Sequence, residues 1–138
     1  MMHKKEQRTL AYPSHVFQPE DWLRFVHGMA FEKKWTKIGL SDDDLRSLEI
    51  AIMLGPKQYP VMEATNGLRK IRFAGHEANQ GKSGANRVCY VFFEDFSIVL
   101  LATVFAKGEQ DNLTAAGKEV ISDFIRKIER QLRDGTIT

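Results

Sequence analysis

Lys70 and Arg72 lie two residues apart in the segment LRKIRFA, residues 68–74, whose residue types have strand spacing. Successive side chains of a strand point to opposite faces, so the two cations are expected on one face and Ile71 and Phe73 on the other. Charged pairs do not belong in a core. Such a pair suits phosphoryl chemistry, in which cations bind the phosphate and stabilise the negative charge of a phosphorane-like transition state.

The positive excess of the chain lies in the same central part. Residues 66–107 contain six Lys/Arg against three acidic residues, whereas residues 1–65 are balanced at nine and nine. Arg87 begins the next expected strand and Lys107 ends the last one, so both are expected to converge with Lys70 and Arg72 on a small sheet. Solvated surface lysines and arginines are the alternative interpretation. Further candidates for contacting RNA are Arg69, Lys82 and Ser83.

RNA supplies its own nucleophile, because its 2′-hydroxyl can attack the adjacent phosphate. Cleavage then needs cations, a proton acceptor and a proton donor. Candidates for proton transfer are Tyr90, Glu109 and His76, which could equally be a strand aromatic, a surface acid and a loop residue. The four histidines are scattered and no spacing resembles a ligand set, so neither a metal nor a cofactor is expected.

The stretch GHEANQGKSG, residues 75–84, superficially resembles a phosphate-binding loop. Its glycines Gly75 and Gly81 are separated by five residues instead of four. The stretch also leads into NRVCYVFF, which has strand composition, whereas a phosphate-binding loop must lead into a helix. We therefore expect a connection between two strands.

Composition indicates one ordinary domain. The chain has 138 residues, 43% of them hydrophobic and 28% charged, which is typical of a soluble globular protein. No apolar run is long enough to span a bilayer, and the single cysteine, Cys89, fits a reducing cytoplasm. We expect an N-terminal extension over residues 1–20 and a single domain over residues 21–138.

Helices and strands are expected in a definite order. Phe31, Trp35 and Ile38 have helical spacing before Gly39, and Ser41 is expected to cap a second helix. Strands are expected over LRKIRFA, NRVCYVFFED and FSIVLLATVFAK, the last two joined at a tight turn around Glu94 and Asp95. A long helix follows, with an apolar stripe of Val120, Ile121, Phe124, Ile125, Ile128 and Leu132. The segment WLRFVHG, residues 22–28, suits either a helix or a strand.

The segments GLRKIRFA, GKSGANRVCYVFF and FAKGEQDNLT, followed by an amphipathic helix, resemble the RelE/HigB family of type II toxins, and its HigB-like branch in particular. The resemblance covers about residues 24–133 and includes FEKKW and LSDDDL. It implies a compact α+β fold: a first strand at WLRFVHG, a helical hairpin, a curved antiparallel sheet of about four strands in all, and a closing helix.

The same resemblance implies an endoribonuclease that cuts translated mRNA on the ribosome in the cytoplasm and stops growth. It implies an antitoxin partner, often a helix-turn-helix protein of the HigA type, and no membrane. Lys70 and Arg72 match basic strand positions that contact the scissile phosphate, Arg87 matches an arginine assigned to transition-state charge, and Lys107 matches a basic position that ends the last strand. Gly108 and Leu113–Thr114 stand where many members have an arginine and a tyrosine, which leaves the general base open.

Two alternatives remain on the sequence alone. A ParE-like poison of DNA gyrase would share the fold without needing the phosphate site, and the cations argue against it. A homologue that only binds its antitoxin is kept open by the missing tyrosine.

Overall fold

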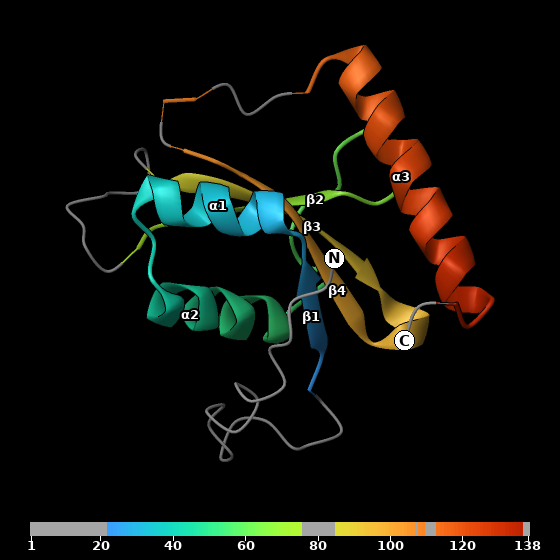
Figure 1. Cartoon of the computed structure of the whole chain (residues 1–138), viewed down its shortest axis with the longest axis horizontal. Helices are drawn as coiled ribbons and strands as arrows, with labels where there is room; N and C mark the ends of the chain where they lie inside the picture. Colours follow the sequence, from blue (N-terminus) through green and yellow to red (C-terminus); the bar gives the residue numbers. More distant parts are fainter. Residues whose placement is uncertain (1–21, 76–84, 107, 110–112, 137–138) are drawn as a thin grey trace.

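The computed structural model describes residues 22–75, 85–106, 108–109 and 113–136. Its elements are β1 (Arg24–His27), α1 (Met29–Ile38), α2 (Asp42–Met53), β2 (Arg69–Phe73), β3 (Asn86–Phe93), the 3-10 turn η4 (Glu94–Phe96), β4 (Ile98–Phe105) and α3 (Ala115–Arg133). This is a mixed α+β fold, as the sequence predicted, and WLRFVHG contributes a strand (Figure 1).

Four strands form one sheet in the order β1-β4-β3-β2. The pairs β2–β3 and β3–β4 are antiparallel, which confirms the two predicted strand connections. β1 instead pairs in parallel with β4, Arg24 opposite Ile98, so the sheet is mixed. The sequence did not predict this orientation, because a parallel partner is brought in from a distant part of the chain.

Helices cover both faces of the sheet (Figure 1). On one face α1 and α2 pack through residues such as Trp35, Leu48 and Ile52 against Ile71 and Val88. On the other face α3 packs against β1, β3 and β4 through residues such as Ile125 and Leu132. Side chains alternate along each strand, so β1, β3 and β4 contribute to both layers. β2 contributes Ile71 and Phe73 to the first layer alone.

α3 covers its face of the sheet only in part. Of its 19 residues only Ile125 and Leu132 are buried, whereas Phe124 and Val120 of the predicted apolar stripe are 48% and 68% exposed. No helix in the described part of the chain is both long and apolar enough to cross a membrane.

The start of α2 is held by a reciprocal cap. The Ser41 hydroxyl accepts a hydrogen bond from the Asp44 amide at 3.0 Å, and Asp44 Oδ2 accepts one from the Ser41 amide at 2.9 Å. Trp35 of α1 donates its indole N–H to the Ser41 carbonyl, which ties the two helices together at their connection. The capping box therefore fixes both the start of α2 and its placement against α1.

We predict that Asp44→Ala lowers the free energy of unfolding by about 1–2 kcal/mol, because it removes half of the capping box. The matched control is Asp43→Ala, one residue away, whose side chain is 83% exposed and pairs with Arg46 only at 3.8 Å. It is expected to cost less than about 0.5 kcal/mol. Urea denaturation measures both, and equal losses would show that the cap has no special role.

Candidate functional site

Three cations meet on the face of the sheet that α3 only partly covers. Arg72 of β2 lies directly opposite Arg87 of β3, and Lys70 lies opposite Cys89. Directly opposed residues of an antiparallel pair project from the same face, with their Cβ atoms about 5 Å apart. Arg72 is exposed, and Lys70 and Arg87 are half-buried. We call Lys70, Arg72 and Arg87 the cationic patch.

On β4, the strand beside β3, the residues next to the cationic patch are uncharged. Phe105 lies opposite Arg87, and Thr103 lies opposite Cys89. Two arginines in direct cross-strand opposition concentrate positive charge on this part of the face. Arg87 also donates to the Ala85 carbonyl, which orients its guanidinium along its own strand. This arrangement suits an anion that contacts Arg72 and Arg87 together.

Arg69 does not join the cationic patch. It is one residue from Lys70 and therefore projects from the other face, opposite Tyr90. Its guanidinium donates to the carbonyls of Lys57 at 3.0 Å and Tyr59 at 2.6 Å. These bonds fasten the segment after α2 to the edge of the sheet, so Arg69 has a structural role where the sequence predicted RNA contact.

Tyr90 is also separated from the patch. Its ring is fully buried in the layer under α1 and α2, and its hydroxyl donates to the Pro56 carbonyl at 2.8 Å. Burial raises the pKa of Tyr90 to about 12, although Arg69 acts in the opposite direction. A buried phenol with a raised pKa on the far face is unsuited to the proton transfer predicted from the sequence.

Glu109 lies just beyond the end of β4, in a turn that two hydrogen bonds between Glu109 and Ala106 close. Its amide donates to the Ala106 carbonyl at 2.9 Å, and its carboxylate accepts from the Ala106 amide at 2.8 Å. Lys34 of α1 donates to the same carboxylate at 3.0 Å. The bond from Ala106, and after it the bond from Lys34, lower the pKa of the Glu109 carboxyl.

Lys34 and Phe105 were not singled out from the sequence. Lys34 Nζ lies 4.9 Å from the centroid of the Phe105 ring, so α1 reaches the end of β4 beside the cationic patch. The only local signal was the aromatic residue of the FAKGE segment. Lys34 itself could not be found from sequence, because its partner Glu109 is 75 residues away.

Several predicted residues lie outside the described part of the chain: His76, Lys82, Ser83 and Lys107. The GKSG segment falls there too, but both of its flanks are described. It leads from β2 into β3, which pair antiparallel, so it joins two strands as predicted. It does not lead into a helix, which excludes a nucleotide-binding loop of the usual kind.

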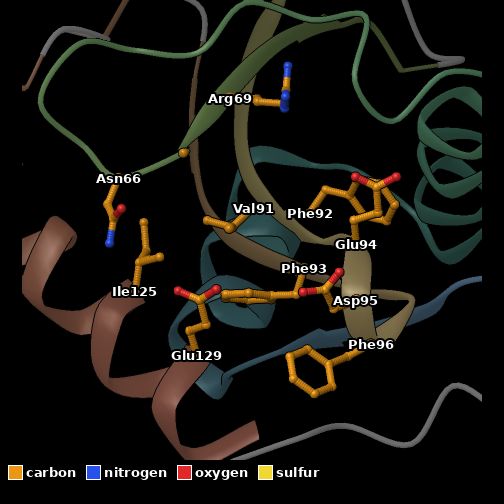
Figure 2. Close-up of a pocket in the computed structure, with 11 residues that line it drawn as sticks. Asn66, Arg69, Val91, Phe92, Phe93, Glu94, Asp95, Phe96, Ile125 and Glu129 are labelled. Atoms are coloured by element: carbon orange, nitrogen blue, oxygen red, sulfur yellow. The ribbon is translucent and has the colours of Figure 1, made fainter. Parts of the chain in front are cut away.

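A different pocket, of about 330 Å³, lies at the hairpin end of the sheet (Figure 2). Figure 2 shows the carboxylates of Glu94, Asp95 and Glu129 around it, with Arg69 apart from them. Arg133 pairs with Asp95 at 3.6 Å and with Glu129 at 3.1 Å. Carboxylates repel phosphate, so this pocket is no alternative site for RNA. Within the described residues, no group of three or more His, Cys, Asp or Glu could hold a metal ion.

No protein-family model matches the chain. The fold is similar to that of the E. coli toxin RelE. A mutant RelE in the free state is 13% identical, with a TM-score of 0.47 over 75% of this chain and 96% of that one. Isolated RelE is 14% identical, with a TM-score of 0.46 over 77% and 98%. A chain of the intact E. coli RelBE toxin–antitoxin complex is 15% identical, with a TM-score of 0.46 over 64% of this chain and 99% of that one. Such values describe the path of the chain and say nothing about activity.

We predict that Tyr90→Phe lowers the free energy of unfolding by about 1 kcal/mol at pH 7, because the Pro56 carbonyl loses its donor. The raised pKa of Tyr90 adds a pH dependence. Between the ordinary value of 10.0 and about 12 the unfolded state loses the phenol proton and the folded state keeps it. Stability of the natural protein should therefore fall over this range, by about 2–3 kcal/mol from this group.

The measurement is denaturant unfolding of both proteins from pH 9 to pH 12. The phenylalanine variant should lack this part of the decline, because it has no phenol to titrate. Parallel curves for the two proteins would contradict a raised pKa for Tyr90.

Proposed function

We propose that the chain is the toxin of a toxin–antitoxin pair and an endoribonuclease that cleaves mRNA at the cationic patch in the cytoplasm. The direct opposition of Arg72 and Arg87 carries the proposal. Two guanidinium groups that project from one face can contact the oxygens of a single phosphodiester together. Lys70, two residues along the same face, extends the patch toward a neighbouring phosphate.

The chemistry requires little covalent participation from the protein. The 2′-oxygen of the RNA attacks its own phosphorus while its proton passes to an acceptor. The bond from phosphorus to the 5′-oxygen breaks, and that oxygen takes up a proton. The products are a 2′,3′-cyclic phosphate and a 5′-hydroxyl. Arg72 and Arg87 stabilise the extra negative charge on the phosphorane-like transition state, where preorganised cations are most effective.

Phe105 gives the patch an aromatic neighbour. It lies opposite Arg87, at the end of the strand next to the cations. Single-stranded RNA is commonly bound by cations that contact its backbone and aromatic rings that stack on its bases. The combination favours a single-stranded substrate over a duplex, which is consistent with mRNA presented on a ribosome.

We predict that Arg87→Ala and Arg72→Ala each reduce cleavage of ribosome-bound mRNA by about 10²–10³-fold, the usual cost of losing one preorganised charge-stabilising group. Lys70→Ala is expected to act mainly on binding. The matched control is Arg126→Ala on α3, whose side chain is 56% exposed and whose guanidinium pairs with Asp123 on the same helix. It should cleave like the natural protein.

The measurement is mapping of mRNA 5′ ends after induction and in a translation reaction with purified components. Growth arrest with intact transcripts would contradict the ribonuclease and favour another toxic action. Normal growth together with antitoxin binding would show that the protein binds its antitoxin but has no toxic activity.

We infer that Glu109 positions the end of β4 and does not accept the proton. Its carboxylate is engaged by Ala106 and Lys34, and its lowered pKa makes it a weaker base. A general base works best with a pKa near the operating pH, so a lowered value points away from that role. The Lys34–Glu109 pair instead ties α1 to the strand that carries Phe105.

We predict that Glu109→Gln reduces cleavage far less than the roughly 100-fold that loss of a general base costs. Lys34→Ala should have a similar effect, and the double variant should be no worse than either single variant, because both remove the same tie. The pH–rate profile of Glu109→Gln should keep its acid limb. If Glu109→Gln loses the acid limb and Lys34→Ala keeps it, Glu109 is the proton acceptor.

A further inference from the structure

An apolar groove lies between α3 and the sheet, on the side of β1 and β4. It has a volume of about 320 Å³, and its lining includes Val26, Ile98, Leu100, Phe124, Ile128 and Leu132. Most of the surface that it exposes belongs to aliphatic and aromatic carbon. A groove of this size and chemistry can hold two or three apolar side chains of a ligand.

The groove is the uncovered part of the α3 packing surface. Phe124 lines it and is 48% exposed, and Val120, one turn earlier on α3, is 68% exposed. Met29, which follows the lining residue Gly28, is 59% exposed. Large exposed apolar side chains that gather around one groove indicate a surface for another protein.

The rim of the groove is positively charged. Arg24 of β1 is exposed and projects from the same face as Val26, two residues away. Lys127 is one turn from both Phe124 and Gln131, and Arg130 lies one turn beyond Lys127. In the part of the chain that the structure describes, no carboxylate pairs with these three side chains. Neighbouring Arg126 and Arg133, by contrast, have acidic partners.

We propose that this α3 groove binds an amphipathic segment of a partner protein whose apolar side chains fill the groove and whose carboxylates meet Arg24, Lys127 and Arg130. Charge complementarity favours an acidic partner, since three neighbouring cations repel a basic segment and attract an acidic one. An apolar centre with a charged rim is the usual build of a protein–protein interface.

The groove and the cationic patch lie at opposite ends of β3. Arg87 is near the start of the strand, and Phe93, which lines the groove, is its last residue. Six residues of extended chain separate them by about 20 Å. A partner seated in the groove therefore leaves Arg72 and Arg87 open, so this contact holds the partner without itself blocking RNA.

The proposal rests on the proposed function in one respect, the choice of partner: the probe is the purified product of the reading frame adjacent to the gene for this chain. We expect Phe124→Asp and Val120→Asp each to raise the Kd by about 30-fold or more, as for the central residues of an interface. The matched control is Val61→Asp, which is also 48% exposed but lies outside the groove, and it should bind like the natural protein.

Charge is tested separately. Lys127→Glu with Arg130→Glu should slow association by about tenfold at low salt, whereas Lys33→Glu with Lys37→Glu on α1 should not. The partner segment protected from hydrogen exchange should contain more Asp and Glu than Lys and Arg. Circular dichroism and thermal melts establish that each variant is folded.

The proposal would be overturned by any of these results: no binding of the probe, unchanged affinity of both α3 variants, a protected partner segment that is basic, or protection centred on Arg72 and Arg87. A homodimer of this chain that Phe124→Asp dissociates would also overturn the proposal.

Measuring RNA cleavage distinguishes failure of the groove proposal from failure of the proposed function. If Phe124→Asp no longer binds the partner and the natural protein cleaves no RNA, the groove proposal is supported and the ribonuclease proposal is contradicted. If cleavage depends on Arg87 and Phe124→Asp binds the partner normally, the ribonuclease proposal is supported and the groove proposal is contradicted.

Discussion

The alternation of side chains along β2 is the constraint on which the rest of the molecule depends. Ile71 faces the layer under α1 and α2, and burying it requires Lys70 and Arg72 to face the other way. A slip of one residue in the β2–β3 register would place two cations in that core. The same register that assembles the core therefore brings Arg72 opposite Arg87. The packed core and the cationic patch are two consequences of one strand pairing.

The two faces of the sheet differ because their helices differ in length and in coverage. The layer under α1 and α2 is filled with large side chains, including Tyr90, whose hydroxyl is held by a backbone carbonyl. The other face is divided: α3 packs on the hairpin half of the sheet, and the far half carries the cationic patch. Since a single helix cannot cover four strands completely, the apolar groove beside α3 and the open cationic surface arise from the same incomplete coverage.

Electrostatics follows the same division. Carboxylates gather at the hairpin end, where Glu94 pairs with Lys57 and Arg133 joins Asp95 to Glu129. Among the described residues, no acidic side chain is paired with Arg72 or with the cations along the rim of the groove. Exposed ion pairs contribute little to stability, so this distribution matters for what the surface attracts more than for how firmly the chain folds.

The sequence by itself determined the three helices, the strands after residue 68 and the separation of faces on β2, whereas local spacing left WLRFVHG open between helix and strand. Period-two and helical spacing, the Ser41 cap and the Gly39 stop are local signals, and the structure confirms each of them. Local signals cannot report which strand lies beside β4 or which helix reaches its end. The tertiary structure alone therefore decided that β1 runs parallel to β4, that the Arg69 guanidinium binds the Lys57 and Tyr59 carbonyls, and that Lys34 holds Glu109. These contacts join residues that are far apart in the chain, and only the packed sheet brings them within reach of one another.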